Sequence, residues 1–329
     1  METIGIIYEI TGNPYFSTEF GGYSNLSEYV YPSEINDICK AVKENGYDYE
    51  VIDGAFDLLN REEKLKSECV VFFNKSIGFK GLERKTPVPV LGQLFQLPMI
   101  GSTAYTMTLA RHKFHTNRLL NGLGFLVPNA YTYYSSYETP KIKTFPVIVK
   151  PNAESDSLGI DEKSVCYTLN EVIAKSKEII EFFGAPAIIE EFIPGDEIKV
   201  AVIGNYTDAM VAGAVSVLKK GKPLLDTFQT REDVMSDYLS YSPLTTTGGL
   251  SNSVRKLATQ IHKALELNDY SRIDFRIGAR GAVYCMEVST HPYIASTNAA
   301  FTSAATQKYN SYAEMINAII TTGRKRLKR

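Results

Sequence analysis

The sequence of 329 residues predicts an α/β (α+β) fold, in which a small α/β domain precedes a larger mixed region. Strand-like and helix-like segments alternate over the first hundred residues, which is typical of parallel strands joined by crossover helices. Later segments read as strand pairs separated by short turns, which favours antiparallel pairing. The length allows two or three domains of normal size. We therefore expect three domains, at residues 1–105, 106–195 and 196–329.

The first domain opens with an apolar strand at residues 4–10, followed by a loop at 11–25 that contains Tyr15, Phe16, Phe20 and Tyr23. Apolar residues at helical spacing then predict a helix up to Gly46, which suits the position after a helix end. Prolines break the pattern near residues 87–90. Further elements are expected at 49–52 (strand), 62–66 (helix), 69–73 (strand) and 98–102 (short strand and turn).

The remaining chain predicts a helix at 109–120 that carries Lys113, and a strand ending at Lys150. A helix with Asn170 as its N-cap and Gly184 as its C-cap follows. Residues 219–250 form a long polar connection with few helix or strand signals, which is typical of a lid. Other expected elements are strands at 187–193, 197–203 and 209–217, and helices at 254–267 and 313–322.

Composition excludes several classes of protein. The net charge of −2 argues against a general nucleic-acid-binding protein, which would be basic. No apolar run of about 18 residues predicts a membrane span. The four cysteines lack the spacing of a metal site or a disulfide framework. The beginning of the chain reads as a strand rather than a signal peptide, so we expect a cytoplasmic protein without nucleic-acid or membrane partners.

Residues 270–298 carry the strongest chemical signal. Two strand-like runs, 271–277 and 282–289, flank a Gly-rich loop and predict a hairpin. In the simplest register Arg272 faces Glu287 and Asp274 faces Cys285, so that Asp274 and Glu287 are diagonal neighbours on one face. Two such carboxylates, with Ser289 as a third oxygen, suit a hard cation. The alternative is an exposed hairpin with ordinary charges.

Two further stretches suit a nucleotide. Lys150 lies at the end of a buried strand and precedes a loop rich in Ser, Asp and Gly, an arrangement that favours phosphate binding. In residues 187–203, Glu190 and Glu197 stand among apolar residues, where carboxylates need hydrogen-bond partners. The adenine amino group and the ribose hydroxyls would supply them, with Phe192 and Ile193 offering apolar surface and a backbone N–H. The alternatives are a solvent-facing lysine and an edge strand with one wet face.

Taken in order, these stretches resemble ATP-grasp enzymes, most closely the D-alanine–D-alanine ligases. The similarity covers roughly residues 98–300, and a weaker similarity extends into the first domain. It rests on three motifs, the phosphate-loop strand PVIVKPNAESDSLG, the adenine-binding hinge IIEEFIPGDE and the magnesium hairpin RIDF…YCMEVSTHP.

The resemblance implies roles for individual residues. Lys113 and Lys150 should hold ATP phosphates, with Ser157 in the covering loop. Asp274 and Glu287 should hold Mg²⁺, for which Mn²⁺ can substitute, and Arg272 should stabilise charge on the transferred phosphoryl group. The expected adenine and ribose contacts are Glu190, Phe192, Ile193 and Glu197.

The sequence also departs from this family. Ser289 stands where the third metal ligand is usually Asn, and Ser155-Asp156 replaces Gly-Ser in the phosphate loop. Tyr293 occupies the place of a Gly, and Asn298 that of a Ser that helps to bind the second amino acid. The catalytic lysine of the family's lid has no clear counterpart, with Thr230 and Arg231 nearest. His291 is expected at the mouth of the site, where we expect it to contact the substrate.

The resemblance therefore implies a ligase that joins a carboxylate to an amine through an acyl phosphate, using ATP and Mg²⁺ on amino-acid-like substrates. Two other interpretations stay open. One is an ATP-grasp cyclase that acts on a single molecule, and the other is a degenerate ATP-binding module with little catalysis. A homodimer is compatible with the sequence, which does not determine the oligomeric state.

Overall fold

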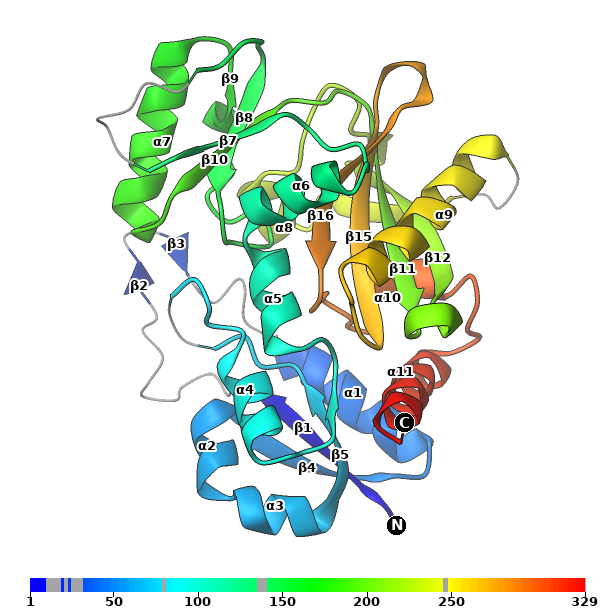
Figure 1. The fold of residues 1–329 in the computed structure, drawn as a ribbon. Helices are drawn as coiled ribbons and strands as arrows, with labels where there is room; N and C mark the ends of the chain where they lie inside the picture. Colours follow the sequence, from blue (N-terminus) through cyan, green and yellow to red (C-terminus); the bar gives the residue numbers. More distant parts are fainter. Residues whose placement is uncertain are drawn as a thin grey trace.

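The computed structural model describes residues 1–9, 19–20, 23–24, 32–78, 81–134, 141–244 and 248–328 (Figure 1). Most of the predicted aromatic loop, including Tyr15 and Phe16, lies outside these residues. Within that loop only β2 (Glu19–Phe20) and β3 (Tyr23–Ser24) are described, and they pair in antiparallel fashion. None of the helices in the described part of the chain combines the length and apolar character needed to cross a bilayer.

The N-terminal sheet has the order β4-β1-β5-β6 and is parallel, as the alternating pattern predicts. Alternate residues of β1 enter different cores, Ile4 and Ile6 on the side of α1, and Ile7 on the side of α2 to α4. The strands are β1 (Thr3–Tyr8), β4 (Asp48–Asp53), β5 (Cys69–Asn74) and β6 (Met99–Ile100), and the helices are α1 (Pro32–Glu44), α2 (Gly54–Asn60), α3 (Glu62–Glu68) and α4 (Pro87–Leu94).

The expected break at residues 87–90 is wrong, because α4 begins there. Pro87 occupies the first turn of the helix. A proline is tolerated at this position because its missing N–H would have no partner within the helix.

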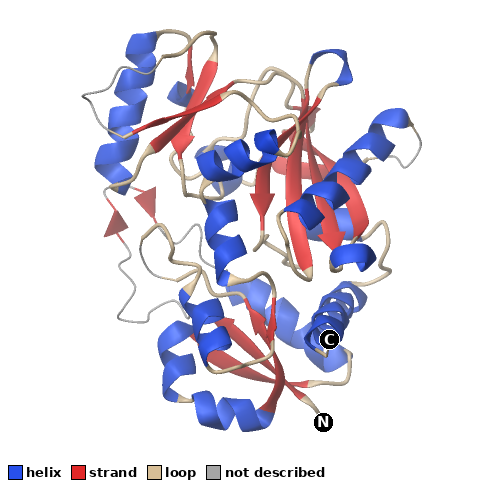
Figure 2. Ribbon diagram, viewed as in Figure 1, coloured by secondary structure: helices blue, strands red, loops and turns tan. Residues whose placement is uncertain are grey.

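The central sheet is antiparallel and has the order β7-β10-β8-β9 (Figure 2). Helix α7 covers one face of it through a core that includes Val149, Val172 and Ile189. The N-cap of α7 is Thr168 rather than the predicted Asn170, whereas Gly184 is its C-cap with φ of 61°. The elements are β7 (Ala130–Tyr133), β8 (Val147–Pro151), β9 (Val165–Cys166), α7 (Leu169–Phe183) and β10 (Ala187–Glu191).

The helix predicted at 109–120 is two helices, α5 (Ala104–Arg111) and α6 (Lys113–Gly122). They separate at His112, where the backbone leaves helical geometry. Asn152 then receives the first N–H groups of α6, its carbonyl accepting from Lys113 at 2.9 Å and its side-chain oxygen from Phe114 at 2.9 Å. The cap fixes the start of α6, and with it Lys113, next to the end of β8.

The C-terminal sheet has the order β13-β12-β11-β15-β16, with β14 also beside β12. Along β11, Ile198 and Val200 enter the core under α9, whereas Glu197 and Lys199 point to the opposite face. The elements are β11 (Asp196–Ile203), β12 (Met210–Lys219), β13 (Lys222–Pro223), α8 (Arg231–Met235), β14 (Leu239–Pro243), α9 (Gly249–Ala264), β15 (Tyr270–Ile277), β16 (Val283–Ser289), α10 (Ala300–Ala305) and α11 (Tyr312–Leu327).

Two expectations for this region need correction. The connection at 219–250 contains β13, α8 and β14 rather than only loop. In the hairpin, Asp274 pairs directly with Glu287 and Arg272 with Ser289, and a bulge follows Asp274. The bulge turns Cys285 to the other face, into the core under α9, where it faces Phe275.

The C-terminal helix lies beside the N-terminal region of the chain. Helix α11 packs against α1 in a core shared by the N-terminal and C-terminal regions (Figure 1). Asp269, which is fully buried, receives hydrogen bonds from Arg326 of α11 at 2.7 and 2.9 Å, from the Gly101 N–H at 2.8 Å and from the Asn205 side chain at 2.8 Å. One carboxylate thus joins three distant segments. The division into domains at 105/106 and 195/196 stays a prediction.

We expect Asp269→Asn to lower the free energy of unfolding by about 3 kcal/mol, because it leaves Arg326 without its buried counter-charge. Asn keeps the shape and tolerates the φ of 66° found at this position. Urea denaturation measures the change. The matched control is Asp208→Asn, whose partner Lys325 also lies on α11 but in an exposed pair, so it should cost less than about 1 kcal/mol. Equal losses in the two variants would contradict this role of Asp269.

Candidate active site

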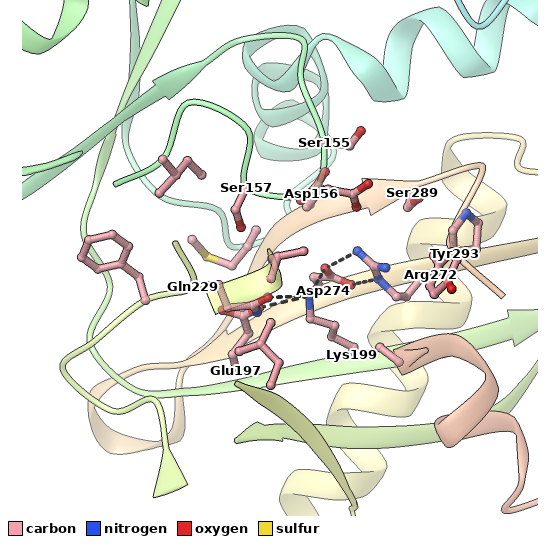
Figure 3. A pocket seen from close by; sticks show the side chains of 18 of the residues that line it. Ser155, Asp156, Ser157, Glu197, Lys199, Gln229, Arg272, Asp274, Ser289 and Tyr293 are labelled. Carbon is pink, nitrogen blue, oxygen red and sulfur yellow. Dashed lines mark hydrogen bonds and ion pairs between the residues drawn. The ribbon is translucent and has the colours of Figure 1, made fainter. Parts of the chain in front are cut away.

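A cavity of about 510 Å³ lies between the N-terminal, central and C-terminal regions of the chain, and Figure 3 shows it from close by. It receives side chains from β8, β11, β15 and β16, and from the loops that follow β8 and β16. Lys113 and Glu190 do not line it. The other predicted site residues all do, namely Lys150, Ser157, Phe192, Ile193, Glu197, Arg272, Asp274, Glu287, Ser289, His291, Tyr293 and Asn298.

A row of charged residues crosses the floor of this cavity. Lys199 on β11 pairs with Asp274 on β15, and Asp274 pairs with Glu287 on β16. Directly opposed residues on neighbouring strands have side chains only about 5 Å apart, so the two carboxylates repel unless positive charge surrounds them. Beyond Glu287 the row ends at Lys113 of α6, whose ammonium lies 3.5 Å from the Glu287 carboxylate.

Asp274 is held most tightly by Arg272. The Arg272 guanidinium donates to both oxygens of Asp274, at 2.7 and 2.9 Å, in a bidentate pair (Figure 3). Arg272 and Asp274 share a face of β15 because alternate residues of a strand point the same way. Arg276 follows on that face and lies 3.5 Å from Glu197. Basic and acidic residues therefore alternate along β15, in the order Arg272, Asp274 and Arg276.

Glu287 carries its negative charge at neutral pH. Burial raises the pKa of its carboxyl group, but Lys113, Arg272, Lys150 and Lys199 together lower that pKa to about 2. Asp274 and Glu287 are oxygen donors of the kind that Mg²⁺ prefers, and Mg²⁺ often takes one or two carboxylates and completes its shell with phosphate and water. The donor set fits a magnesium ion, although the described residues contain no group of three His, Cys, Asp or Glu side chains that could hold a metal.

Lys150 projects from β8 into the cavity with Glu190 behind it. The two side chains lie on one face of the central sheet, where Glu190 pairs with Ile148, two residues from Lys150. Their charged atoms are 2.5 Å apart, and Glu190 is almost completely buried. In this structure Glu190 is thus a counter-charge for Lys150. Its predicted contact with adenine stays a prediction.

The loop after β8 lies across the cavity from Asp274 and Arg272 (Figure 3). Asp156 and Ser157 have φ of 54° and 57°, in the left-handed region. Consecutive non-glycine residues rarely adopt it, and such backbone clusters at functional sites. Lys85 of the N-terminal region donates to the Ser155 hydroxyl at 3.3 Å. Glu154 is also fixed from outside the loop, by Arg84 and Arg111 at 3.0 Å each.

One end of the cavity is apolar and suits a flat ring. Phe192 and Phe228 meet edge to face with ring centroids 6.1 Å apart, and Arg276 lies 5.4 Å from the centre of the Phe192 ring. The Phe192 N–H donates to the Pro146 carbonyl at 3.1 Å, so it is not available to a ligand. At the border of this end Glu197 accepts a hydrogen bond from Gln229.

The opposite end contains the residues that depart from the family pattern. Tyr293 lies in a segment fixed by the buried pair Glu34–Lys75, whose charged atoms are 3.0 Å apart. Lys75 donates to the Pro292 carbonyl at 2.9 Å, and Glu34 accepts from the Ile294 N–H at 2.7 Å. Both flanks of Tyr293 are therefore fixed.

Asn298 and His291 complete that end. Asn298 donates to Asp237, in the turn between α8 and β14, and both residues line the cavity. Burial lowers the pKa of His291 well below its usual value, with Lys75 and Lys85 adding to the effect, so its imidazole is neutral at pH 7.

The two lid residues nearest to the family's lysine do not line the cavity. Thr230 caps α8 through Asp233. Arg231 instead joins the lid to the phosphate loop, its N–H donating to the Ile160 carbonyl at 2.9 Å and its guanidinium to the Asp156 carbonyl at 3.2 Å. The lid thus contacts the phosphate loop directly.

Several residues of the cavity were not predicted from the sequence, chiefly Lys199, Arg276 and the pair Glu34–Lys75. Lys199 could have been found, because it stands two residues after Glu197 and two-residue periodicity places both on one face. Arg276 follows Asp274 by the same rule. The pair Glu34–Lys75 had no such signal, since its members come from different elements.

Comparison with known proteins agrees with this geometry. A family model described as D-ala D-ala ligase C-terminus matches residues 134–321, more than half of the chain. The chain belongs to the D-alanine–D-alanine ligase family. It is an ATP-dependent ligase that forms an amide bond, as the order of its motifs predicts. Among its relatives is a D-alanine–D-alanine ligase of Halalkalibacterium halodurans, 28% identical over 92% of this chain and 96% of that protein.

Solved structures confirm the ATP-grasp fold. The D-alanine–D-alanine ligase of Bacillus anthracis in complex with ATP aligns with a TM-score of 0.75 and 17% identity, over 100% of this chain and 99% of that one. The VanG D-Ala:D-Ser ligase of Enterococcus faecalis aligns with a TM-score of 0.72 and 18% identity, over 98% and 99% of the two chains.

We expect Glu287→Gln to reduce turnover about a hundredfold or more, because it removes charge from the centre of the row. The fold should persist, since the amide keeps the shape of the carboxylate. Phosphate release from ATP in the presence of mixed amino acids measures turnover. The control is Glu191→Gln, which changes a residue of β10 that contacts Asn129 outside the cavity. Near-normal turnover of Glu287→Gln would contradict its place in the active site.

Proposed function

We propose that the cavity binds ATP with its adenine between Phe192 and Ile193, its ribose at Glu197 and its phosphates at Lys113 and Lys150 under the loop of Ser157. The apolar end of the cavity, Glu197 at its border and the charged floor follow one another in the order of base, ribose and triphosphate. Asp274 and Glu287, with Ser289 as a weaker donor, would hold magnesium. Bound there, it would neutralise phosphate oxygens during transfer.

In the first step a substrate carboxylate oxygen attacks the γ-phosphorus of ATP. The bond to the bridging oxygen breaks, ADP leaves with the electron pair, and an acyl phosphate forms. Arg272, held by Asp274 at the cavity floor, stabilises the charge on the transferred group. Lys150 and Lys113 fix the phosphates, so that positioning and electrostatics supply the acceleration.

In the second step an amine nitrogen attacks the acyl carbon and loses a proton, and phosphate leaves with the former carboxylate oxygen. The structure offers cations around this position rather than a nucleophilic side chain. The four cysteines are buried, and burial raises the pKa of each thiol above its usual value. Direct transfer from the acyl phosphate to the amine therefore fits the site.

The single observation that carries this proposal is the row Lys199–Asp274–Glu287 on the floor of the cavity, with Lys113 beyond Glu287 at its end. A module that only bound ATP would not need two carboxylates placed directly opposite each other, because adenine and phosphates are held elsewhere. Repulsion between the two carboxylates destabilises the protein as long as no cation is bound between them. A bound cation offsets it when the enzyme is loaded.

We also propose that the preferred product is not D-alanyl-D-alanine. The pair Glu34–Lys75 holds the backbone on both sides of Tyr293, so this residue keeps its position in the cavity wall. Asn298 is engaged with Asp237 of the lid, which changes how a second carboxylate would be received. A pocket bounded in this way suits amino-acid-like substrates larger or flatter than D-alanine.

We expect D-alanine to lose a competition against a broad set of amino acids, scored by kcat/KM. Tyr293→Gly should raise kcat/KM for D-alanine relative to the preferred substrate by about tenfold or more, because it removes the ring from the pocket wall. The control is Tyr134→Gly, which changes an exposed tyrosine outside the cavity. If D-alanine wins in both positions with the unmodified enzyme, this substrate proposal is wrong.

A further inference from the structure

Lys199 is a buried lysine that the proposed mechanism does not use. Its side chain is 9% exposed and lines the cavity floor, with the ammonium between Glu197 and Asp274. Burying a lysine is costly unless its charge is balanced, so its partners should show what it does.

The contacts of Lys199 are long. Its ammonium lies 3.3 Å from Asp274, 3.4 Å from Glu197 and 3.5 Å from the Gln229 side-chain oxygen. Charge-assisted hydrogen bonds from nitrogen to a carboxylate are usually 2.7–2.9 Å, the range that Arg272 achieves with the same Asp274. Lys199 is therefore shared among three oxygens, and its flexible stem allows the ammonium to leave them.

The ammonium shares one oxygen with Arg272. Oδ2 of Asp274 is 2.9 Å from Arg272 and 3.3 Å from Lys199. Magnesium requires carboxylate oxygens at 2.0–2.1 Å. A fixed positive charge at this distance from the ligand oxygen opposes a cation that arrives alone. A cation that arrives with a triphosphate brings oxygens to which the ammonium can move.

We propose that Lys199 is an internal counterion of Asp274 that makes metal binding depend on nucleotide binding. Without nucleotide, its ammonium neutralises Asp274 and Glu197 and disfavours a free divalent cation. With nucleotide, the ammonium transfers to phosphate oxygens and releases Asp274 to the metal. The inference rests on the proposed role of Asp274 as a metal ligand.

The test is binding of Mn²⁺ alone and in the presence of a non-hydrolysable ATP analogue, followed by electron paramagnetic resonance. In the unmodified protein the analogue should strengthen Mn²⁺ binding strongly. Lys199→Met keeps the length of the side chain and removes its charge. It should strengthen binding of Mn²⁺ alone by about tenfold, the scale of a typical coupling between two ligands, and reduce the effect of the analogue by a similar factor. Lys199→Arg should behave like the unmodified protein.

Lys175→Met is the matched control, because Lys175 is also a buried lysine but pairs with Asp161 and Glu178 on the far side of the central sheet. It should leave Mn²⁺ binding unchanged. Circular dichroism checks that Lys199→Met folds, and Lys199→Gln replaces it in the same titration if it does not. Unchanged or weaker binding of Mn²⁺ alone to the charge-removed variant would overturn the proposal.

Asp274→Asn separates this inference from the function on which it rests. If Asp274→Asn binds Mn²⁺ with the analogue as well as the unmodified protein does, the metal-ligand assignment itself is wrong. If Asp274→Asn abolishes binding while Lys199→Met has no effect, only the counterion role of Lys199 is wrong.

Discussion

The candidate active site depends on the balance of charge around Asp274 and Glu287. The strand register places these carboxylates directly opposite each other, a position in which like charges destabilise a sheet. The neighbouring cations balance the negative charge of the two carboxylates. Arg272 forms a bidentate pair with Asp274, Lys199 borders it from β11, and Lys113 borders Glu287 from α6. Three strands of one sheet and one helix must therefore meet correctly before the charges of the row are balanced, so the precision of the fold and the electrostatics of the site depend on each other.

The sheet that carries the row separates its two tasks by face. Residues such as Ile198 and Phe275 pack under α9, whereas Lys199 and Asp274 look into the cavity. The bulge after Asp274 preserves this separation along the hairpin. Glu287 faces the site, whereas Cys285, two residues earlier on β16, faces the core. Packing of the apolar face fixes the positions of the strands, and the strands in turn fix the positions of the charged side chains on the polar face. Charges held in place in this way, such as the bidentate pair of Arg272 and Asp274, stabilise a transition state with little rearrangement.

Much of this arrangement could be predicted from sequence because it depends on local periodicity. The parallel N-terminal sheet and the strand pairs follow from alternating apolar residues and turn residues, and the ATP-grasp fold was expected from the resemblance of the three motifs to that family. The register of the hairpin could not be predicted, since a bulge leaves no mark in a two-residue pattern. The division of the expected helix 109–120 into two helices at His112 could not be predicted either. Asn152, which caps the second helix, comes from a loop that is distant in the sequence. The pair Glu34–Lys75, which fixes Tyr293, likewise exists only in the folded chain.

The central claim is that the substrate carboxylate itself attacks ATP on this charged floor. The most direct test supplies the enzyme with ATP and a mixture of D- and L-amino acids labelled with ¹⁸O in their carboxylates, and analyses the released phosphate by mass spectrometry. An acyl phosphate transfers one labelled oxygen to phosphate when the amine displaces it, so the account predicts labelled phosphate together with an amide product. Release of unlabelled phosphate, which would mean that water attacks ATP, or no ATP turnover in the whole mixture, would contradict it.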